Sequence, residues 1–349
     1  MFNPAHISTL KLPNRFIRSA TAEFAANPDG TIIDDYYELY TNLALGEVGL
    51  IIQGHLYIMD EGKAHDKMAG IAQEYHLDGL KQIIQCVRNA RTGTKIAAQL
   101  NHGGFHSVSK KGPSQKVPSK NDNQETKTMT EEDIENVVEN FGKAALKAKQ
   151  TGYDAVQIHA AHGYLISQFL NSKVNRRSDS WGGGLENRAN LLLSVYKEVR
   201  SQVGSNYPVL VKINNSDEPH EGFPVEESAK VVKWLAEEGL DAVEISGLRS
   251  TRTNFEDEAY FTKNARIIKK NIGDMPLSVV GGFRSLKIIQ QLHEEFADFI
   301  SICRPFIREP DLVKKFREGK KRADCISCNK CFKPPLIITC LDKENSANS

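Results

Sequence analysis

The sequence lacks several features that mark other classes of protein. Its apolar runs stay well short of the ~18 residues that a membrane-spanning helix needs, and its first residues, MFNPAHISTLKLPNR, have no apolar signal-peptide core. Acidic and basic residues nearly cancel, leaving a formal net charge of +1, and basic residues do not interleave with aromatics. We therefore expect a cytoplasmic protein with neither a membrane nor a nucleic acid as partner.

Cysteine is also scarce. Six cysteines in 349 residues do not make a disulfide scaffold, and a chain of this length can bury a large core without disulfides or metals. Four of the six fall in one C-terminal run, CISCNKCFKPPLIITC, at positions 325, 328, 331 and 340. Clustered thiols of this kind indicate a metal or redox site in a reducing compartment.

Short apolar segments rich in β-branched residues recur along the chain. Near-continuous apolar strands are typical of a parallel sheet that is covered on both faces. The eight predicted strands span residues 16–21, 48–54, 95–101, 155–160, 209–214, 242–247, 277–282 and 299–304.

Amphipathic helical patterns lie between these strands. The clearest begins after Thr130, which has capping-box spacing to Asp133, and others cover 187–202, 225–238 and 284–295. Eight alternations of strand and helix predict an α/β fold, a (β/α)8 TIM barrel. A doubly wound sheet is the weaker alternative, because no G-x-G-x-x-G follows any strand.

The remaining segments define the predicted domain organisation. We assign residues 1–320 to the barrel, with a short hairpin over 1–14 that caps its bottom, and 321–349 to a Cys-rich extension with a disordered tail from Leu341. Residues 103–128 are rich in Gly, Ser, Lys and Pro and follow the third strand. This segment is either a lid or binding loop at the barrel mouth or a solvated insertion.

Polar residues gather where the predicted strands end, which is where barrels carry their chemistry. The fourth strand ends in IHAAHGY, with His159, His162 and Tyr164. If the chain turns after Ala160, the two imidazoles share one side and can donate to one acceptor, such as a carbonyl oxygen gaining negative charge. A metal would need more ligands than two histidines supply. Tyr164 is a candidate proton donor.

Three further strand ends suggest an anionic ligand. Lys212 ends an apolar strand and would be costly there without a negative partner. Gly281 and Gly282 follow the seventh strand and Arg304 follows the eighth. Because barrels commonly bind phosphate after strands seven and eight, with glycines letting backbone N–H groups approach, these residues predict a phosphate site.

At this point the chain resembles the Old Yellow Enzyme family of FMN-dependent oxidoreductases, from about Pro4 to Leu312. The most specific segment is IHAAHGYLISQFLNSKVNRRSDSWGGGLENR, which is similar to the family pattern H-x-x-H-x-Y followed by N-x-R-x-D-x-Y-G-G-x-x-x-N-R. LPNRFIRSAT, AAQLNHGG and ISICRPFIREPDL also match. The resemblance implies a barrel with one FMN at its mouth and NADH or NADPH as reductant.

The resemblance also implies roles for individual residues. His159 and His162 would grip a substrate carbonyl, and Tyr164 would protonate the α-carbon while the β-carbon receives hydride, so that the C=C bond of an α,β-unsaturated carbonyl compound is reduced. The residues implied to contact FMN are Ala20, Thr21, Ala22, Gly54, Gln99, Lys212, Gly281, Gly282 and Arg304. By analogy with relatives, a homo-oligomer is expected.

The chain departs from the family pattern at three places. Trp181 replaces the usual tyrosine, Lys212 stands where arginine is common, and Ala22 stands where many members have a cysteine or threonine that bonds the flavin. A lysine provides a point charge without the planar fork of arginine, and Ala22 cannot donate through its side chain. Thr21, one residue earlier, could compensate.

The cysteine run resembles the 2,4-dienoyl-CoA reductase branch, which binds a 4Fe–4S cluster after its flavin barrel. The spacing differs from that branch at Cys331 and Cys340, and the branch's nucleotide-binding domains do not follow in this sequence. Fe–S, zinc and a site without metal remain open. Three functions are therefore considered: an ene-reductase, an electron-transfer component with a separate partner, and a ligand-binding barrel without redox turnover.

Overall fold

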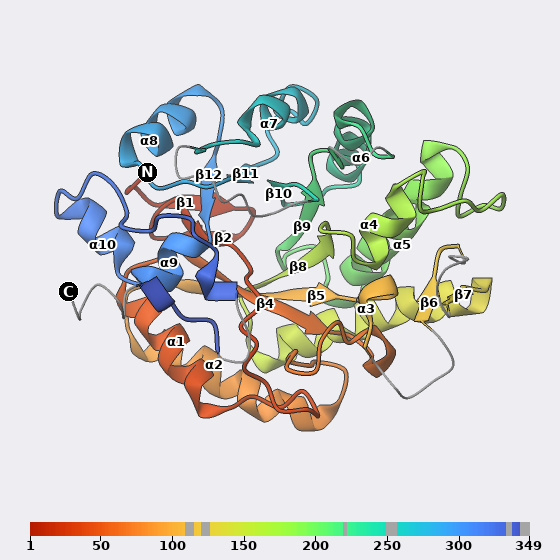
Figure 1. Ribbon diagram of the computed structural model, residues 1–349, viewed down its shortest axis with the longest axis horizontal. Helices are drawn as coiled ribbons and strands as arrows, with labels where there is room; N and C mark the ends of the chain where they lie inside the picture. Colours follow the sequence, from red (N-terminus) through yellow and green to blue (C-terminus); the bar gives the residue numbers. More distant parts are fainter. Residues whose placement is uncertain (109–114, 120–125, 219–221, 249–256, 333–336, 343–349) are drawn as a thin grey trace.

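Eight parallel strands close into a barrel in the computed structural model, and helices surround it (Figure 1). The structure describes all residues except 109–114, 120–125, 219–221, 249–256, 333–336 and 343–349, so the predicted disordered tail lies largely outside the described residues. The barrel strands are β3 Phe16–Arg18, β4 Leu50–Tyr57, β5 Lys95–Asn101, β8 Ala155–Ala160, β9 Val209–Asn214, β10 Ala242–Ser246, β11 Leu277–Val280 and β12 Phe299–Ile302. The predicted (β/α)8 fold is confirmed.

The helices follow the predicted pattern. Residue Thr130 caps the longest one: its side chain accepts from the N–H of Asp133, whose carboxylate accepts from the N–H of Thr130. The helices are α1 Asp34–Leu45, α2 Leu77–Asn89, α3 Glu131–Thr151, α4 Leu165–Leu170, α5 Leu185–Val203, α6 Val225–Glu237, α7 Thr262–Lys269, α8 Leu286–Glu295, α9 Arg304–Arg308 and α10 Leu312–Arg317. Short 3₁₀ turns are η1 Asp60–Gly62, η2 Glu74–His76, η3 Gly104–His106 and η4 Lys330–Phe332.

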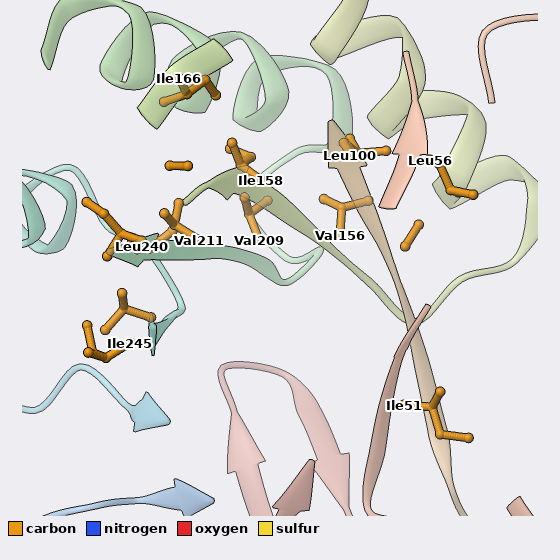
Figure 2. Close-up of a cluster of buried hydrophobic side chains, with 14 of the residues drawn as sticks. Ile51, Leu56, Leu100, Val156, Ile158, Ile166, Val209, Val211, Leu240 and Ile245 are labelled. Atoms are coloured by element: carbon orange, nitrogen blue, oxygen red, sulfur yellow. The ribbon is translucent and has the colours of Figure 1, made fainter. Parts of the chain in front are cut away.

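Apolar side chains fill the space between the strands and the surrounding helices. Figure 2 shows part of this layer, where Ile158 and Val211 project from their strands and Ile166 packs from α4. All three are 0–1% exposed. Outward-facing strand residues thus carry the sheet-to-helix core, which leaves inward-facing positions at the strand ends free for polar groups.

A separate apolar cluster closes the N-terminal end of the barrel. The predicted hairpin is present as β1 Ala5–Ile7 paired antiparallel with β2 Leu10–Leu12. Its inward residues pack against side chains near the beginnings of the barrel strands, including Ile17, Leu50 and Phe299. The barrel is therefore plugged at this end and open only at the other.

Five strand ends differ from those predicted: β10, β11 and β12 end one or two residues early, and β3 and β4 differ by three residues. Strand β3 ends at Arg18, three residues early, because Thr21 turns to donate to the carbonyl of Ser19. Strand β4 runs on to Tyr57, and its pairing with β5 shifts by one residue between Gln53 and Leu56. Such a shift is a β-bulge, which lets the strand continue while changing where its side chains point.

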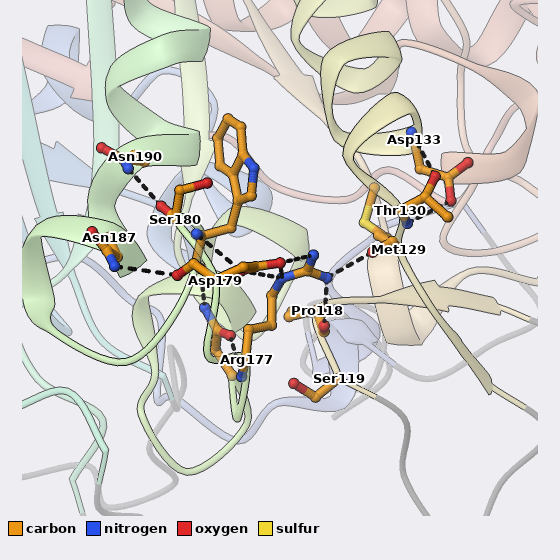
Figure 3. A network of polar contacts seen from close by, with 12 residues as sticks. Pro118, Ser119, Met129, Thr130, Asp133, Arg177, Asp179, Ser180, Asn187 and Asn190 are labelled. Atoms are coloured by element: carbon orange, nitrogen blue, oxygen red, sulfur yellow. Dashed lines mark hydrogen bonds and ion pairs between the residues drawn. The ribbon is translucent and has the colours of Figure 1, made fainter.

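The polar motif that begins at Asn175 holds neighbouring loops together. Arg177 donates to Asp179 (3.0 Å) and to the carbonyl oxygens of Pro118 and Met129 (3.1 and 2.7 Å), while Asn187 donates to the carbonyl oxygen of Asp179 (Figure 3). These bonds tie the connection before α5 to the segment that precedes α3. Two βα loops are thereby fixed beside the barrel mouth.

Segment 103–128 is only partly described. It contains η3 and a two-stranded sheet of β6 Gln115–Val117 and β7 Thr126–Thr128. Within the described part of the chain, no helix has both the length and the apolar content needed to cross a membrane.

Candidate active site

A cavity of about 450 Å³ opens at the carboxyl ends of the barrel strands. Its volume falls in the range of about 300–1,000 Å³ that is typical of ligand sites. Ten of the twelve predicted catalytic and cofactor residues line it: Ala20, Thr21, Ala22, Gln99, His159, His162, Tyr164, Lys212, Gly282 and Arg304. Most of the candidates from the strand ends and from the family resemblance therefore lie around one cavity.

The other two predicted residues, Gly54 and Gly281, lie off the cavity wall that the described residues form. A Cβ on Gly54 would sit 2.0 Å from Glu23 Oε2, and the Gly54 N–H donates to that side chain's other oxygen (3.2 Å). A Cβ on Gly281 would meet the backbone nitrogens of Tyr260 and Phe261 at 3.3 Å. Both glycines thus allow close packing behind the wall.

The two histidines at the end of β8 face each other. Their ring centroids are 5.0 Å apart and their planes are perpendicular. The chain turns at the second of them: His162 has φ 62° and the next residue, Gly163, has φ 76°. The backbone N–H of His162 donates to Asn214 Oδ1 (3.0 Å), and the ring nitrogen Nε2 of His162 lies 2.8 Å from the hydroxyl of Ser246. These bonds hold a left-handed backbone that residues other than glycine adopt uncommonly.

Burial sets the charge of this pair. Desolvation lowers the pKa of both His159 and His162 well below the ordinary value. The charges of Lys212 and His55 add to both shifts, and that of His162 adds to the shift of His159. Both rings are therefore neutral near pH 7. His159 Nδ1 is buried and has no hydrogen-bond partner among the described residues, so this ring has a nitrogen available for a ligand.

Tyr164 completes this wall of the cavity. Its ring centroid lies 5.1 Å from that of His159, at the residue that precedes α4. Burial raises the pKa of Tyr164 to about 12, so the phenol keeps its proton at neutral pH. A protonated phenol beside two neutral imidazoles can donate both hydrogen bonds and a proton.

Lys212 has the negative partner that the sequence required. Its Nζ lies 3.6 Å from Glu244 and donates to Ser19 Oγ (2.7 Å), and all contacts are buried. The two residues are direct neighbours in the β9–β10 register. Sequence reasoning missed Glu244, although an acid in the apolar segment AVEISG was a usable signal, since it mirrors the lysine in VLVKIN.

The same carboxylate begins a chain of amides across the barrel. Gln157 donates to Glu244 Oε2 (2.9 Å), and Gln99 donates to Gln157 Oε1 (2.7 Å). Because a carboxylate only accepts, the direction of both bonds is fixed, and the carbonyl oxygen of Gln99 is left to accept. This end of the cavity therefore presents an acceptor, from Gln99, and a cation, from Lys212.

Arg304 lies on the cavity wall next to the Cys-rich extension. Its guanidinium donates to Asn329 Oδ1 (2.7 Å) and to the carbonyl oxygen of Ser327 (3.3 Å). Asn329 and Phe332, both from the extension, also line the cavity. The extension carries no periodic pattern, so its return to the site could not be predicted from its residues.

The four clustered cysteines line one small cavity beside Arg304. The Ser327 N–H bonds to the sulfur of Cys325, and Ser327 and Asn329 both have left-handed backbones, with φ 58° and 59°. Among the described residues, however, no three metal-ligating side chains lie close enough to share one ion. A single Zn²⁺ requires four sulfurs about 2.3 Å from one centre, whereas the thiolates of a cluster bind separate irons. The described thiols thus form no ready site for a single Zn²⁺ ion.

Comparison with known proteins agrees with the geometry. The family model "NADH:flavin oxidoreductase / NADH oxidase family" matches residues 1–323. The chain is 28% identical to an NADH oxidase of Thermoanaerobacter brockii over 94% of its own length and 52% of that protein. It is 32% identical to an NADPH dehydrogenase of Geobacillus thermodenitrificans, covering 89% of this chain and 91% of that one.

Solved structures show the same relationship. A 2-naphthoyl-CoA reductase in complex with 2-naphthoyl-CoA aligns with a TM-score of 0.89 at 26% identity, over 97% of this chain and 56% of that one. An old yellow enzyme homologue from Zymomonas mobilis aligns with a TM-score of 0.79 at 25% identity, over 94% and 95%. The chain spans about half the length of the first curated relatives that it matches. It belongs to the NADH:flavin oxidoreductase / NADH oxidase family, the FMN-dependent oxidoreductases of Old Yellow Enzyme type.

Proposed function

We propose that the protein is an ene-reductase, which uses NADH or NADPH to reduce the C=C bond of α,β-unsaturated carbonyl compounds. The observation that carries this proposal is the wall formed by His159, His162 and Tyr164 over one ligand-sized cavity. Bound FMN would accept hydride from the nicotinamide and deliver it to the β-carbon. Family membership favours this redox role over a ligand-binding barrel without turnover.

The cavity has the polar groups that FMN requires. Lys212 provides a cation and Gln99 an acceptor at the inner end, where the anionic edge and the imide N–H of a flavin pyrimidine would bind. Gly282 and Arg304 lie on the wall where the phosphate would be held. Thr21 Oγ1 already donates to the carbonyl of Ser19, so its hydroxyl is not a ready substitute for the donor missing at Ala22.

The substrate would be activated by neutral donors. An imidazole N–H that donates to the carbonyl oxygen stabilises negative charge as it develops, and it does so without reorganisation in a dry site. Tyr164 would then transfer its proton to the α-carbon. Burial raises the pKa of Tyr164 to about 12. The phenol therefore holds its proton at any ordinary pH and gives it up only to a strongly basic carbon.

A second cavity of about 530 Å³ adjoins this wall and would receive the rest of the substrate. It is lined by His106, Gly163 and Leu248, among others, and Leu248 also lines the first cavity. The ring of His106 lies 5.8 Å from that of Tyr164. We therefore expect substrates larger than the reacting enone itself.

Replacement of Tyr164 by phenylalanine tests the proposal, because it removes the proton and keeps the ring. Reduction of cyclohex-2-enone by the reduced enzyme should slow by about 10²–10⁴-fold, while flavin reduction by NAD(P)H should stay within twofold of wild type. Stopped-flow absorbance separates these half-reactions. Equal loss in both would contradict the proton-donor role.

A second candidate, an electron-transfer component, is favoured by the four thiols beside Arg304. We propose a 4Fe–4S cluster there, with zinc as the alternative, held in a reducing cytoplasm and served by a separate partner. The residues between these cysteines also line the main cavity. Broad visible absorbance that bleaches with dithionite, together with iron and sulfide analysis, supports the cluster. Stoichiometric zinc alone would refute it.

A further inference from the structure

A third imidazole, His55, projects into the cavity from the bulge in β4. In a regular strand, residues an odd number apart face opposite sides, yet Ile51 and Leu56 both pack in the layer against the helices (Figure 2). The one-residue shift between Gln53 and Leu56 explains this. The extra residue turns His55 toward the mouth, where it lines the cavity. Bulges commonly redirect a side chain beside an active site.

The tautomer of His55 follows from its neighbour. Asn101 Nδ2 lies 2.9 Å from His55 Nδ1. An amide NH₂ can only donate, so Nδ1 accepts and the ring proton is on Nε2. Burial, together with the charges of His65 and Lys212, lowers the pKa of His55 to about 3. The ring is thus a neutral donor with a fixed proton.

That donor has no acceptor among the described residues. His55 Nε2 is fully buried without a hydrogen-bond partner, and the residue is 6% exposed. An unsatisfied buried donor destabilises the protein, and a ligand that supplies an acceptor would remove that cost. The ring lies 5.1 Å from that of Tyr164 and 6.1 Å from that of His159, so it belongs to the same wall.

We propose that His55 is a further catalytic residue, whose Nε2–H donates to a carbonyl oxygen of the bound flavin or of the bound substrate. This inference rests on the proposed function. A hydrogen bond from His55 Nε2–H would compensate for the side-chain donor that Ala22 lacks at the cavity rim. Both possible acceptors are carbonyl oxygens, and an experiment distinguishes them. Loss of a hydrogen bond to the flavin changes the midpoint potential of the flavin, whereas loss of one to the substrate changes enone turnover at constant potential.

His65 provides a matched control. Its ring nitrogens are also buried without a partner among the described residues, and its pKa is lowered to about 4. Its ring packs on Phe24 at 4.4 Å and lies 5.6 Å from that of His55, outside the lining of the cavity. A general effect of removing a buried imidazole should therefore appear equally at both positions.

The experiment compares His55→Phe, His55→Gln and His65→Phe with wild type. Measurements are the Kd for FMN, the midpoint potential of bound FMN, and kcat and KM for cyclohex-2-enone. His55→Phe should change FMN affinity or enone kcat/KM by at least about 10-fold, with His65→Phe within threefold of wild type. His55→Gln, which keeps an N–H donor, should recover part of the loss.

Each outcome decides the inference. If His55→Phe binds FMN and turns over within threefold of wild type at an unchanged potential, the inference is wrong and the proposed function stands. Equal losses in His55→Phe and His65→Phe also overturn it. If wild type binds no FMN, both proposals fall. Should His55→Phe fail to fold by circular dichroism, His55→Ala, which also lacks a donor, replaces it and is judged by the same limits against His65→Phe.

Discussion

The two ends of the barrel interior differ in polarity. At the N-terminal end, the hairpin and the strand starts bury an apolar cluster that includes Leu12 and Phe299. At the C-terminal end, the interior is polar: Lys212 and Glu244 are paired, and His159 and His55 keep unpartnered nitrogens among the described residues. The first end is complete without a ligand and the second is not. Stability should therefore depend on both ends, but cofactor binding on only one.

Lys212→Met should have the largest effect, because it acts on both stability and FMN binding at the polar end. It leaves the Glu244 carboxylate buried without a cation, which costs about 3–5 kcal/mol, and it removes the charge proposed to hold FMN. We expect urea unfolding of the apoprotein to show that loss and fluorescence titration to show weak FMN binding. The double variant Lys212→Met/Glu244→Leu should regain most of the stability but not the affinity. Recovery of both would show that the lysine serves the fold alone.

Leu12→Ala tests the other end. The side chain is fully buried, so truncation should cost about 2–5 kcal/mol through lost burial and a cavity. FMN affinity, measured well below the unfolding transition, should match wild type within twofold. A large drop in affinity would mean that the two ends are not independent.

Acid should act on the polar end. The pKa of His55 is lowered to about 3, and that of His159 is lowered well below its ordinary value. Between the folded and unfolded pKa values the unfolded chain binds more protons, so stability is lost as pH falls below about 6.5. We expect the free energy of unfolding to fall by about 1.4 kcal/mol per pH unit for each such histidine. Urea unfolding between pH 7 and 5 measures the slope, which Leu12→Ala should preserve.

Thr130→Ala gives the smallest effect and a baseline outside the barrel interior. Loss of the capping box before α3 should cost about 1 kcal/mol. Neither FMN affinity nor enone turnover should change. A change in either would indicate that α3 transmits strain to the mouth.

The sequence predicted what depends on regular periodicity. Eight strands, the capping box at Thr130 and the turn that brings His159 to His162 follow from local patterns, and the structure bears them out. It missed His55, because a bulge shifts the facing of a strand without changing its composition. It missed Asn329 because the extension reaches the cavity through long-range contacts with Arg304. Gly54 was predicted to line the cavity because it ends a predicted strand. That position alone does not distinguish a residue that lines the cavity from one that packs closely behind its wall.

The most direct test of the account is the visible spectrum of the purified protein through one anaerobic turnover. We expect one bound FMN per chain, whose visible absorbance bleaches with NADH or NADPH and returns on addition of cyclohex-2-enone. Protein that takes up no FMN, or reduced flavin that the enone fails to reoxidise, would contradict it.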